Sequence, residues 1–329
     1  MEKKISIVLI IVYLITIIYL LVHIYCYIYD IPKTIFENIQ TPVKPIPLQN
    51  NNIKVWTYWE GKPNIIADIC LKSIVNSCKK ANEILNNTEE KYEHIHITKD
   101  NIDKYLEKNL NDYICYTEDE LILKSDLIRL SLLKKYGGIW LDISILVLSP
   151  MNQIFEKELK YDHFYAIYNP RNDSSQLPNY PVVETSLLYA PPNHPLIVDW
   201  ANGMNFIEKC DNDHRVKYSS SQPSFTTIKF LQPSYHYTYY VFRHILINSR
   251  GIQNYNNVLL LSDHKKKYMG FIHYNINDIL LMSRADFIKK YNVTENVTAI
   301  KLCGFDRKTL EQIINSNQYH PESILMTDI

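Results

Sequence analysis

The stretch from Ser125 to Pro150, SDLIRLSLLKKYGGIWLDISILVLSP, is the most informative part of the sequence, because a double-glycine turn joins two regular elements within it. From Glu118 onward the apolar residues recur at helical spacing, which predicts a helix. Asp126 and Arg129 are three positions apart and therefore share one face of that helix. The stretch thus predicts a helix that presents a carboxylate and a guanidinium group side by side.

The double glycine predicts a sharp change from helix to strand. Gly137 and Gly138 supply the positive-φ conformation that closes a helix, and the run Ile139–Leu141 that follows is typical of a buried strand. Asp142 stands at the end of this strand. Because side chains alternate along a strand, Asp142 and Ser144 are expected on the same side, where they can face a ligand together.

The charged groups of this stretch are of the kind that bind phosphorylated sugars. Asp142 can orient ribose, sugar hydroxyls or a hard cation, and Arg129 can form paired hydrogen bonds with phosphate or sugar oxygens. Each group also has a plainer interpretation. An Asp–Arg pair at this spacing is commonly a surface ion pair, and a strand-end Asp is commonly a turn former. The ordered combination favours a ligand site.

The whole motif resembles the glycosyltransferases with a sugar-binding DxD motif, and within them the capsular-polysaccharide-synthesis type. Relatives of that type include initiating mannosyltransferases and clostridial toxin glucosyltransferases. Their shared pattern is an SD-x-x-R helix, a Y-G-G turn, an aromatic or aliphatic residue and D-x-D. It stands here as Ser125, Asp126, Arg129, Tyr136, Gly137, Gly138, Trp140 and Asp142. Ser144 stands where most relatives carry the second Asp, and capsular-type members often have a small hydroxyl residue there.

The resemblance implies a fold, a chemistry and a set of site residues. The fold is of the GT-A type, an α/β fold with a mixed central sheet that binds a nucleoside-diphosphate sugar. Asp126, Arg129 and Asp142 are implied as catalytic and donor-binding residues. Mn²⁺ or Mg²⁺ is implied as the cofactor, held by Asp142 and Ser144, so that metal dependence turns on the residue at position 144.

Two further blocks extend the resemblance from about Ile53 to Arg307. The first, KVWTYWEGKP at 54–63, is similar to the opening strand of the nucleotide-binding half, and it makes Tyr58 and Trp59 candidate donor-binding residues. An aromatic face can stack a nucleobase for roughly 1–3 kcal/mol. The alternative is that these aromatic residues only pack in the core and at its rim. The second block, AIKLCGFDR at 299–307, is similar to a Lys-Leu-containing segment near the end of capsular-type members.

The N-terminus predicts a membrane anchor. Residues 5–29 carry no formal charge, and a span needs about 20 apolar residues. Lys3 and Lys4 precede this run and Asp30 follows it, which predicts a cytoplasmic N-terminus and a catalytic domain in the lumen or outside the cytoplasm, in a Golgi- or ER-like lumen if the host is eukaryotic. A cleaved secretory signal is the alternative, but the run is long for one and no small-x-small cleavage site follows. A single-pass signal anchor is therefore the favoured interpretation.

The domain organisation follows from the anchor and from the composition. We expect a cytoplasmic tip and anchor over residues 1–30, a proline-rich stem over 31–52 and one catalytic domain over 53–329. The chain has 35 Lys and Arg against 35 Asp and Glu, and it has no basic stripe, so no nucleic-acid partner is expected.

Alternating strand and helix patterns beyond the stem predict a mixed α/β sheet. Expected strands are 55–58, 94–98, 139–142, 145–148, 163–168 and 185–189, and expected helices are 64–81, 102–108, the Asp126 helix, 195–209 and 235–248. Tyrosines from Tyr235 to Tyr240 are candidates for an acceptor site, although packing is the commoner role for such residues. Glu184 is a candidate contact for acceptor or donor, with a helix cap or a surface turn as the alternative. His236, His244 and His273 are weaker candidates as metal or phosphate ligands.

These observations predict a membrane-anchored glycosyltransferase that moves a sugar from a nucleoside diphosphate to a glycan or glycoconjugate acceptor. The resemblance implies retention of anomeric configuration, with the departing phosphate taking the acceptor proton and no protein base. A catalytically inactive, membrane-tethered carbohydrate-binding relative is the main alternative. A nucleotidyltransferase ranks last, because it needs another clustered carboxylate pair and none stands near the glycine turn.

Overall fold

The structure of the chain is a computed structural model, and it describes residues 52–61, 64–86, 90–106, 118–154, 161–168, 180–208, 236–262, 268–269, 274–291, 297–302 and 304–327. All of these belong to one compact unit that spans Val43–Ile329. The predicted anchor at 5–29 and nearly all of the predicted stem lie outside the described residues. Among the residues that are described, no helix is long and apolar enough to cross a membrane.

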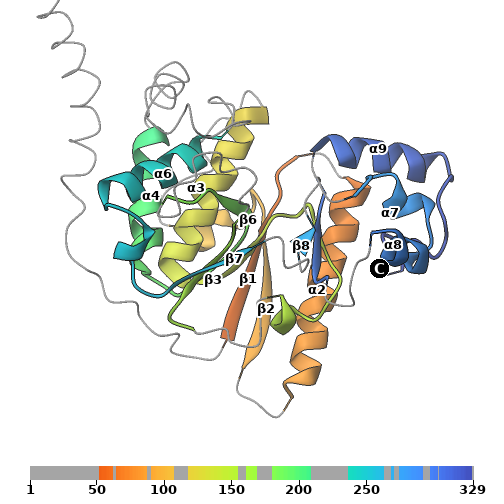
Figure 1. Cartoon of the computed structure of the whole chain (residues 1–329), viewed down its shortest axis with the longest axis horizontal. Coiled ribbons are helices and arrows are strands. Elements are labelled where there is room, and N and C mark those ends of the chain that lie inside the picture. The colour runs from red at the N-terminus through yellow and green to blue at the C-terminus, as the bar shows by residue number, and fades with distance from the viewer. Residues whose placement is uncertain are drawn as a thin grey trace, which may run out of the picture. The chain divides into compact units, whose positions relative to one another are not determined.

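A six-stranded mixed sheet forms the centre of the unit (Figure 1). β1 lies between two parallel neighbours, β2 and β3, whereas β6 runs antiparallel to both β3 and β5. The strand order is β2 (Lys91–Ile97), β1 (Asn52–Tyr58), β3 (Gly138–Leu141), β6 (Val183–Ala190), β5 (Phe164–Tyr168) and β7 (Val258–Ser262). The predicted mixed α/β architecture is therefore confirmed.

Helices cover both faces of this sheet. α2 (Ile65–Ile84) packs on one face, where its apolar residues share a buried cluster with alternate residues of β1 and β3 (Figure 1). The other face carries α3 (Glu118–Tyr136), α4 (Pro195–Glu208) and α6 (Tyr237–Asn248). Asn64 caps α2 by accepting hydrogen bonds from the amides of Ile66 and Ala67.

A second, three-stranded sheet continues the chain beyond β3. It consists of β4 (Ile145–Val147), β9 (Ala299–Lys301) and β8 (Tyr268–Met269), with β9 antiparallel to β4. Helices α7 (Asp278–Leu281), α8 (Arg284–Lys290) and α9 (Gly304–Asn315) pack with this sheet against the first half of α2. Since β4 pairs with β9 directly after the turn at Asp142, the end of β9 is brought close to that residue.

Most predicted elements are present, with ends shifted by one to three residues. Larger differences concern short elements. The helix expected at 102–108 is, within the described residues, one turn of 3-10 helix, η1 (Ile102–Lys104). Further single turns are η3 (Met151–Gln153) and η4 (Ile252–Asn254), and β7, β8, β9, α7, α8 and α9 were not predicted. β7, β8, β9, α7 and α8 have two to seven residues, too few to show a clear period in the sequence, whereas α9 has twelve residues and was missed.

The two glycines of the motif have the predicted left-handed conformations, with φ of 65° at Gly137 and 101° at Gly138. Gly138 also lies directly against β1, since a Cβ there would stand 2.3 Å from the carbonyl oxygen of Lys54. The indole Nε1 of Trp56 donates to the carbonyl oxygen of Gly137 at 2.8 Å. The turn thus ties the end of α3 to the central strand and sets the start of β3.

Replacement of Gly138 by alanine is expected to destabilise the domain strongly. The Cβ would meet the β1 backbone and the residue would have to keep a positive φ, so we expect a loss of at least about 2 kcal/mol in the free energy of unfolding. Gly61→Ala is the matched control, because Gly61 also has a positive φ, of 143°, but nothing lies within 4 Å of its added Cβ. Urea denaturation midpoints measure both variants, and equal losses would refute the close contact.

Candidate functional site

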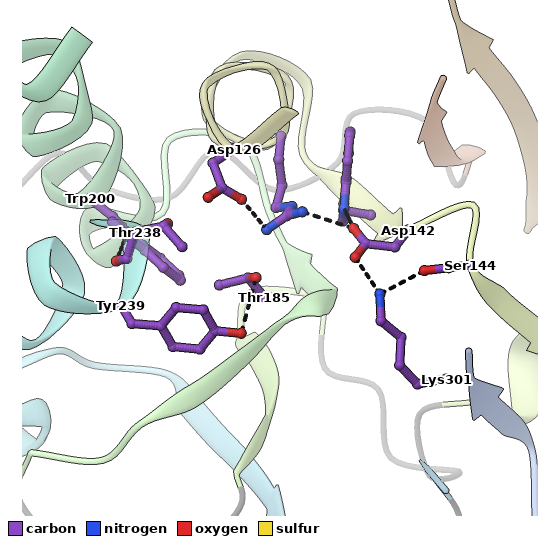
Figure 2. A network of polar contacts seen from close by, with 10 residues as sticks. Asp126, Asp142, Ser144, Thr185, Trp200, Thr238, Tyr239 and Lys301 are labelled. Atoms are coloured by element: carbon purple, nitrogen blue, oxygen red, sulfur yellow. Dashed lines mark hydrogen bonds and ion pairs between the residues drawn. The ribbon is translucent and has the colours of Figure 1, made fainter. Parts of the chain in front are cut away.

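A buried chain of charges forms at the end of β3 (Figure 2). Arg129 donates from Nη1 to Asp126 Oδ1 at 2.6 Å and from Nη2 to Asp142 Oδ1 at 2.8 Å. The side chains of Asp126 and Arg129 are each 5% exposed, and that of Asp142 is 23% exposed. The pair at 126 and 129 is therefore not a surface ion pair, and the three predicted catalytic residues lie together.

Local structure explains why these side chains meet. Asp126 and Arg129 share one face of α3, as the three-residue spacing predicts, and Asp142 directly follows β3. Trp140, two residues earlier on the same face of the strand, donates from Nε1 to Asp142 Oδ1 at 2.9 Å. Its ring also lies 5.0 Å from the guanidinium carbon of Arg129. Asp142 forms a turn as well, since its carbonyl accepts from the amide of Ile145 at 2.9 Å.

The fourth charge of the site comes from the far end of the chain. The ammonium of Lys301, at the end of β9, donates to Asp142 Oδ2 at 2.6 Å and to Ser144 Oγ at 2.7 Å (Figure 2). Asp142 and Ser144 thus contact one ammonium together, although residues 143 and 144 lie in the turn between β3 and β4 and not in a strand. Sequence reasoning singled out the block 299–307 but gave Lys301 no role. The signal was present in the Lys-Leu pair, but its partner stands 159 residues away.

Burial and these contacts shift the pKa values of the two carboxyl groups in opposite directions. Burial by itself would raise the pKa of Asp142, but Lys301 and Arg129 hold that pKa well below its usual range. Burial raises the pKa of Asp126 to about 6, and Asp142 adds to the rise while Arg129 opposes it. Burial works against the charge of Arg129, yet its two carboxylate partners raise its pKa. The site keeps Asp142 ionised at neutral pH.

The predicted metal ligands were tested against the contacts that they make. Asp142 Oδ1 accepts from Arg129 and Trp140, while Asp142 Oδ2 and Ser144 Oγ both accept from Lys301. Mn²⁺ and Mg²⁺ need several oxygen ligands that are open to them. Within the described part of the chain, no three His, Cys, Asp or Glu side chains gather to hold an ion. The residues at this site do not fit a divalent ion while Lys301 holds its place.

Of the two predicted donor-binding aromatics, Tyr58 is the last residue of β1 and Trp59 follows it directly. The Tyr58 hydroxyl donates to Glu60 Oε2 at 2.5 Å, and the same oxygen accepts from the buried ammonium of Lys124 on α3 at 2.5 Å. The Trp59 ring lies 5.8 Å from the guanidinium carbon of Arg307 on α9. Sequence reasoning missed Glu60, Lys124 and Arg307, whose pairings join distant segments.

Tyr239 is a candidate acceptor residue that lies close to the charged site. Thr185 Oγ1 donates to the Tyr239 hydroxyl at 3.5 Å (Figure 2). The His236 ring meets the Tyr239 ring edge-on. Burial raises the pKa of Tyr239 well above its usual value, with Glu184 and then Asp126 adding to the rise and Arg129 opposing it. Tyr239 therefore lies within electrostatic reach of the α3 charges.

Two other candidates of that region are buried in α6, and two lie outside the described residues. His244 is buried in α6, burial lowers its pKa to about 4, and its Nε2 is hydrogen-bonded to the Asn248 side chain at 2.9 Å. Tyr240 is fully buried. Tyr235 and His273 fall outside the described residues. The packing interpretation holds for His244 and Tyr240.

The raised pKa of Asp126 predicts a distinct pH dependence of stability. The folded chain holds this proton more tightly than the unfolded chain, whose Asp titrates near 3.8, so the contribution of Asp126 falls as pH rises from about 4 to 6. The difference in unfolding free energy between wild type and Asp126→Asn should fall over that window, by up to about 1.4 kcal/mol per pH unit, and level off above it. Parallel curves in urea titrations at pH 4, 5, 6 and 7 would contradict the assignment.

Comparison with known proteins gives a family. The profile of the family described as "Capsular polysaccharide synthesis protein" matches residues 25–269, which is 245 of the 329 residues. The comparison with curated proteins gives no match.

Several solved glycosyltransferase structures are similar at low identity. One is a glycosyltransferase involved in glycosylation of the major capsid of PBCV-1, with 9% identity and a TM-score of 0.41 over 80% of this chain and 98% of that one. Another is the galactosyltransferase LgtC in complex with donor and acceptor sugar analogues, with 10% identity and a TM-score of 0.35 over 80% and 96%. A third is mouse xyloside xylosyltransferase 1, with 10% identity and a TM-score of 0.33 over 76% and 97%.

These structural likenesses are weak. The family match, by contrast, covers well over half of the chain and includes α3, β3 and Asp142. The chain therefore belongs to the capsular polysaccharide synthesis protein family, which confirms both the family predicted from the motif and the predicted class of enzyme, a glycosyltransferase.

Proposed function

We propose that this protein is a membrane-anchored glycosyltransferase of the GT-A type that moves a sugar from a nucleoside-diphosphate sugar to a glycan or glycoconjugate acceptor. The observation that carries the proposal is the carboxylate of Asp142, held between two cations where β3 leaves the central sheet. Ligands of open α/β sheets bind at the carboxyl ends of strands. β3 runs parallel to β1, so Tyr58, Trp59 and Asp142 all lie at that edge.

Each site residue takes a role that its contacts permit. Asp142, ionised and partly exposed, accepts hydrogen bonds from hydroxyls of the donor ribose or sugar. Arg129 uses its two terminal nitrogens on Asp126 and Asp142, so we assign it to positioning Asp142. Asp126 in turn orients Arg129. Trp59 offers an aromatic ring to the nucleobase, with Arg307 beside it.

The reaction proceeds with retention of anomeric configuration. The acceptor hydroxyl attacks the anomeric carbon on the face from which the diphosphate departs. The bond from that carbon to the phosphate oxygen breaks, the bond to the acceptor oxygen forms, and the acceptor proton passes to the departing phosphate. This scheme needs no protein base, and the charge that develops on the diphosphate has to be neutralised by cationic groups of the site. Tyr239 and Thr185 lie on the α6 side, where we place the acceptor.

Residues 5–29 anchor the protein as a single-pass signal anchor with a cytoplasmic N-terminus, and the catalytic domain lies in the lumen or outside the cytoplasm. The support is the uncharged length of this run and the lysines before it. The stem at 31–52 then holds the domain away from the bilayer.

Donor hydrolysis tests the proposed activity directly. The full-length chain in mild detergent is incubated with a panel of nucleoside-diphosphate sugars, with Mn²⁺ or with EDTA, and the released nucleoside diphosphate is measured. We expect turnover of at least one donor and a loss of about 100-fold in kcat/KM for Asp142→Asn, because the variant removes the charge at the strand end. Glu83→Gln is the control, since Glu83 is exposed in the last turn of α2, whereas the charged site is built from α3, β3 and β9.

The outcomes of this assay separate the candidate functions. Turnover that Asp142→Asn leaves unchanged would contradict the assigned site. A protein that binds glycans but neither binds nor hydrolyses any donor would be the inactive carbohydrate-binding relative.

Membrane association is tested by fractionation. The full-length chain should stay with the membranes after alkaline carbonate extraction. This treatment releases proteins that are bound by charge, but it does not release a chain held by an apolar span. Addition of a protease to sealed vesicles reports on which side the domain lies. Extraction of the intact full-length chain by carbonate would exclude the anchor.

A further inference from the structure

The ammonium of Lys301 occupies the position between Asp142 and Ser144 at which the sequence motif predicts a divalent metal ion. We infer that Lys301 itself supplies the positive charge for the diphosphate of the donor, so that this enzyme binds its donor without a divalent cation. The inference rests on the proposed function, because it concerns the same donor.

The local charge supports this exchange. A metal-binding DxD pair places two carboxylates around a doubly charged ion, so the group is neutral as a whole. Here a hydroxyl replaces one carboxylate and a singly charged ammonium replaces the ion, so that Asp142, Ser144 and Lys301 are also neutral together. Loss of the second acid and gain of the lysine compensate each other. A divalent ion added to this set would face a single carboxylate that already has cationic partners on both oxygens.

The geometry leaves the ammonium able to donate further. An ammonium has three N–H donors, and in the described part of the chain its contacts with Asp142 and Ser144 use two of them. The side chain of Lys301 is 18% exposed, whereas that of Lys124, which pairs with Glu60, is 1% exposed. The third N–H of Lys301 is therefore available to a phosphate oxygen, and Lys124 is not placed to take this role.

The backbone around Lys301 is held on both sides. The amide of Leu302 donates to the carbonyl oxygen of Ser144 at 2.8 Å, and the Tyr274 hydroxyl donates to the carbonyl oxygen of Lys301 at 2.5 Å. β9 is also paired with β4 from Lys301 to Ala299. A cation fixed in this way needs little reorganisation when a diphosphate arrives, which is the condition under which a charge contributes most.

A second cation of the same segment extends the site toward the nucleobase. Arg307, six residues after Lys301, lies over the ring of Trp59. Burial raises the pKa of the Cys70 thiol to about 12, and Arg307 and Lys301 both oppose that rise, so both cations lie near this one residue of α2. A diphosphate that joins a base at Trp59 to a sugar at Asp142 would pass both. Lys301 and Arg307 both come after residue 269 in the sequence, the last residue of the family match.

Nucleotide binding with and without metal tests the inference. The full-length chain in mild detergent is titrated calorimetrically with UDP, GDP, ADP, CDP and dTDP, once with EDTA and once with Mn²⁺. We expect the nucleotide that binds to do so in EDTA, with a Kd that changes by less than about threefold when Mn²⁺ is present. Lys301→Met should weaken this binding by roughly 10- to 100-fold, the range for a lost hydrogen bond to a charged group.

Two controls accompany the titration. Lys308→Met removes the same charge from an exposed position on α9, and it should leave Kd within about twofold of wild type. Thermal melts report whether Lys301→Met folds. If it does not, Ser144→Ala removes only one of the two contacts of the ammonium, and a measurably higher Kd in EDTA is then the expected result.

The outcomes separate the inference from the proposed function. Binding by the wild type that appears only with Mn²⁺ would overturn the inference and leave the proposed function standing. Binding in EDTA that folded Lys301→Met retains at full strength would overturn it as well. If the folded wild type binds no nucleotide in either condition, the proposed function fails and the inference fails with it.

Discussion

The pairing of the Asp142 carboxylate with Arg129 on one oxygen and Lys301 on the other is the interaction on which the site depends. A largely buried carboxylate has lost most of its hydration, and these two cations and the Trp140 indole replace it. The partners come from α3, β3 and β9, so the main sheet and the small sheet cannot separate at this point without leaving a charge unpaired. A polar network thereby fixes how two apolar layers meet.

This network also divides labour among groups of similar chemistry. Asp126 and Asp142 are both carboxylates next to Arg129, yet burial raises the pKa of the first while two cations depress the pKa of the second. Only Asp142 keeps an exposed portion large enough to meet a ligand. Likewise Lys124 and Lys301 both pair with acids, but Lys124 is enclosed and holds Glu60 near β1. Burial, more than residue type, decides which charges support the structure and which are open to a substrate.

Much of the fold was predictable because its signals are local. The three-residue spacing of Asp126 and Arg129 and the helix-ending glycines are each set by backbone geometry within one or two elements. The structure differs where elements are short. The strand that carries Lys301 has three residues, too few to show a period in the sequence. η1 likewise has three residues and forms a single turn.

The amino-acid sequence by itself determined the helix–turn–strand motif, the family and three of the four charges at the strand end. Only the tertiary structure decided that the fourth is Lys301, that it stands where a metal ion was predicted, and that Arg307 covers Trp59. The physical reason is range. Backbone conformation and alternation act over a few residues, whereas an ion pair depends on distance in space, and the pairing of β4 with β9 brings together groups that lie 159 residues apart.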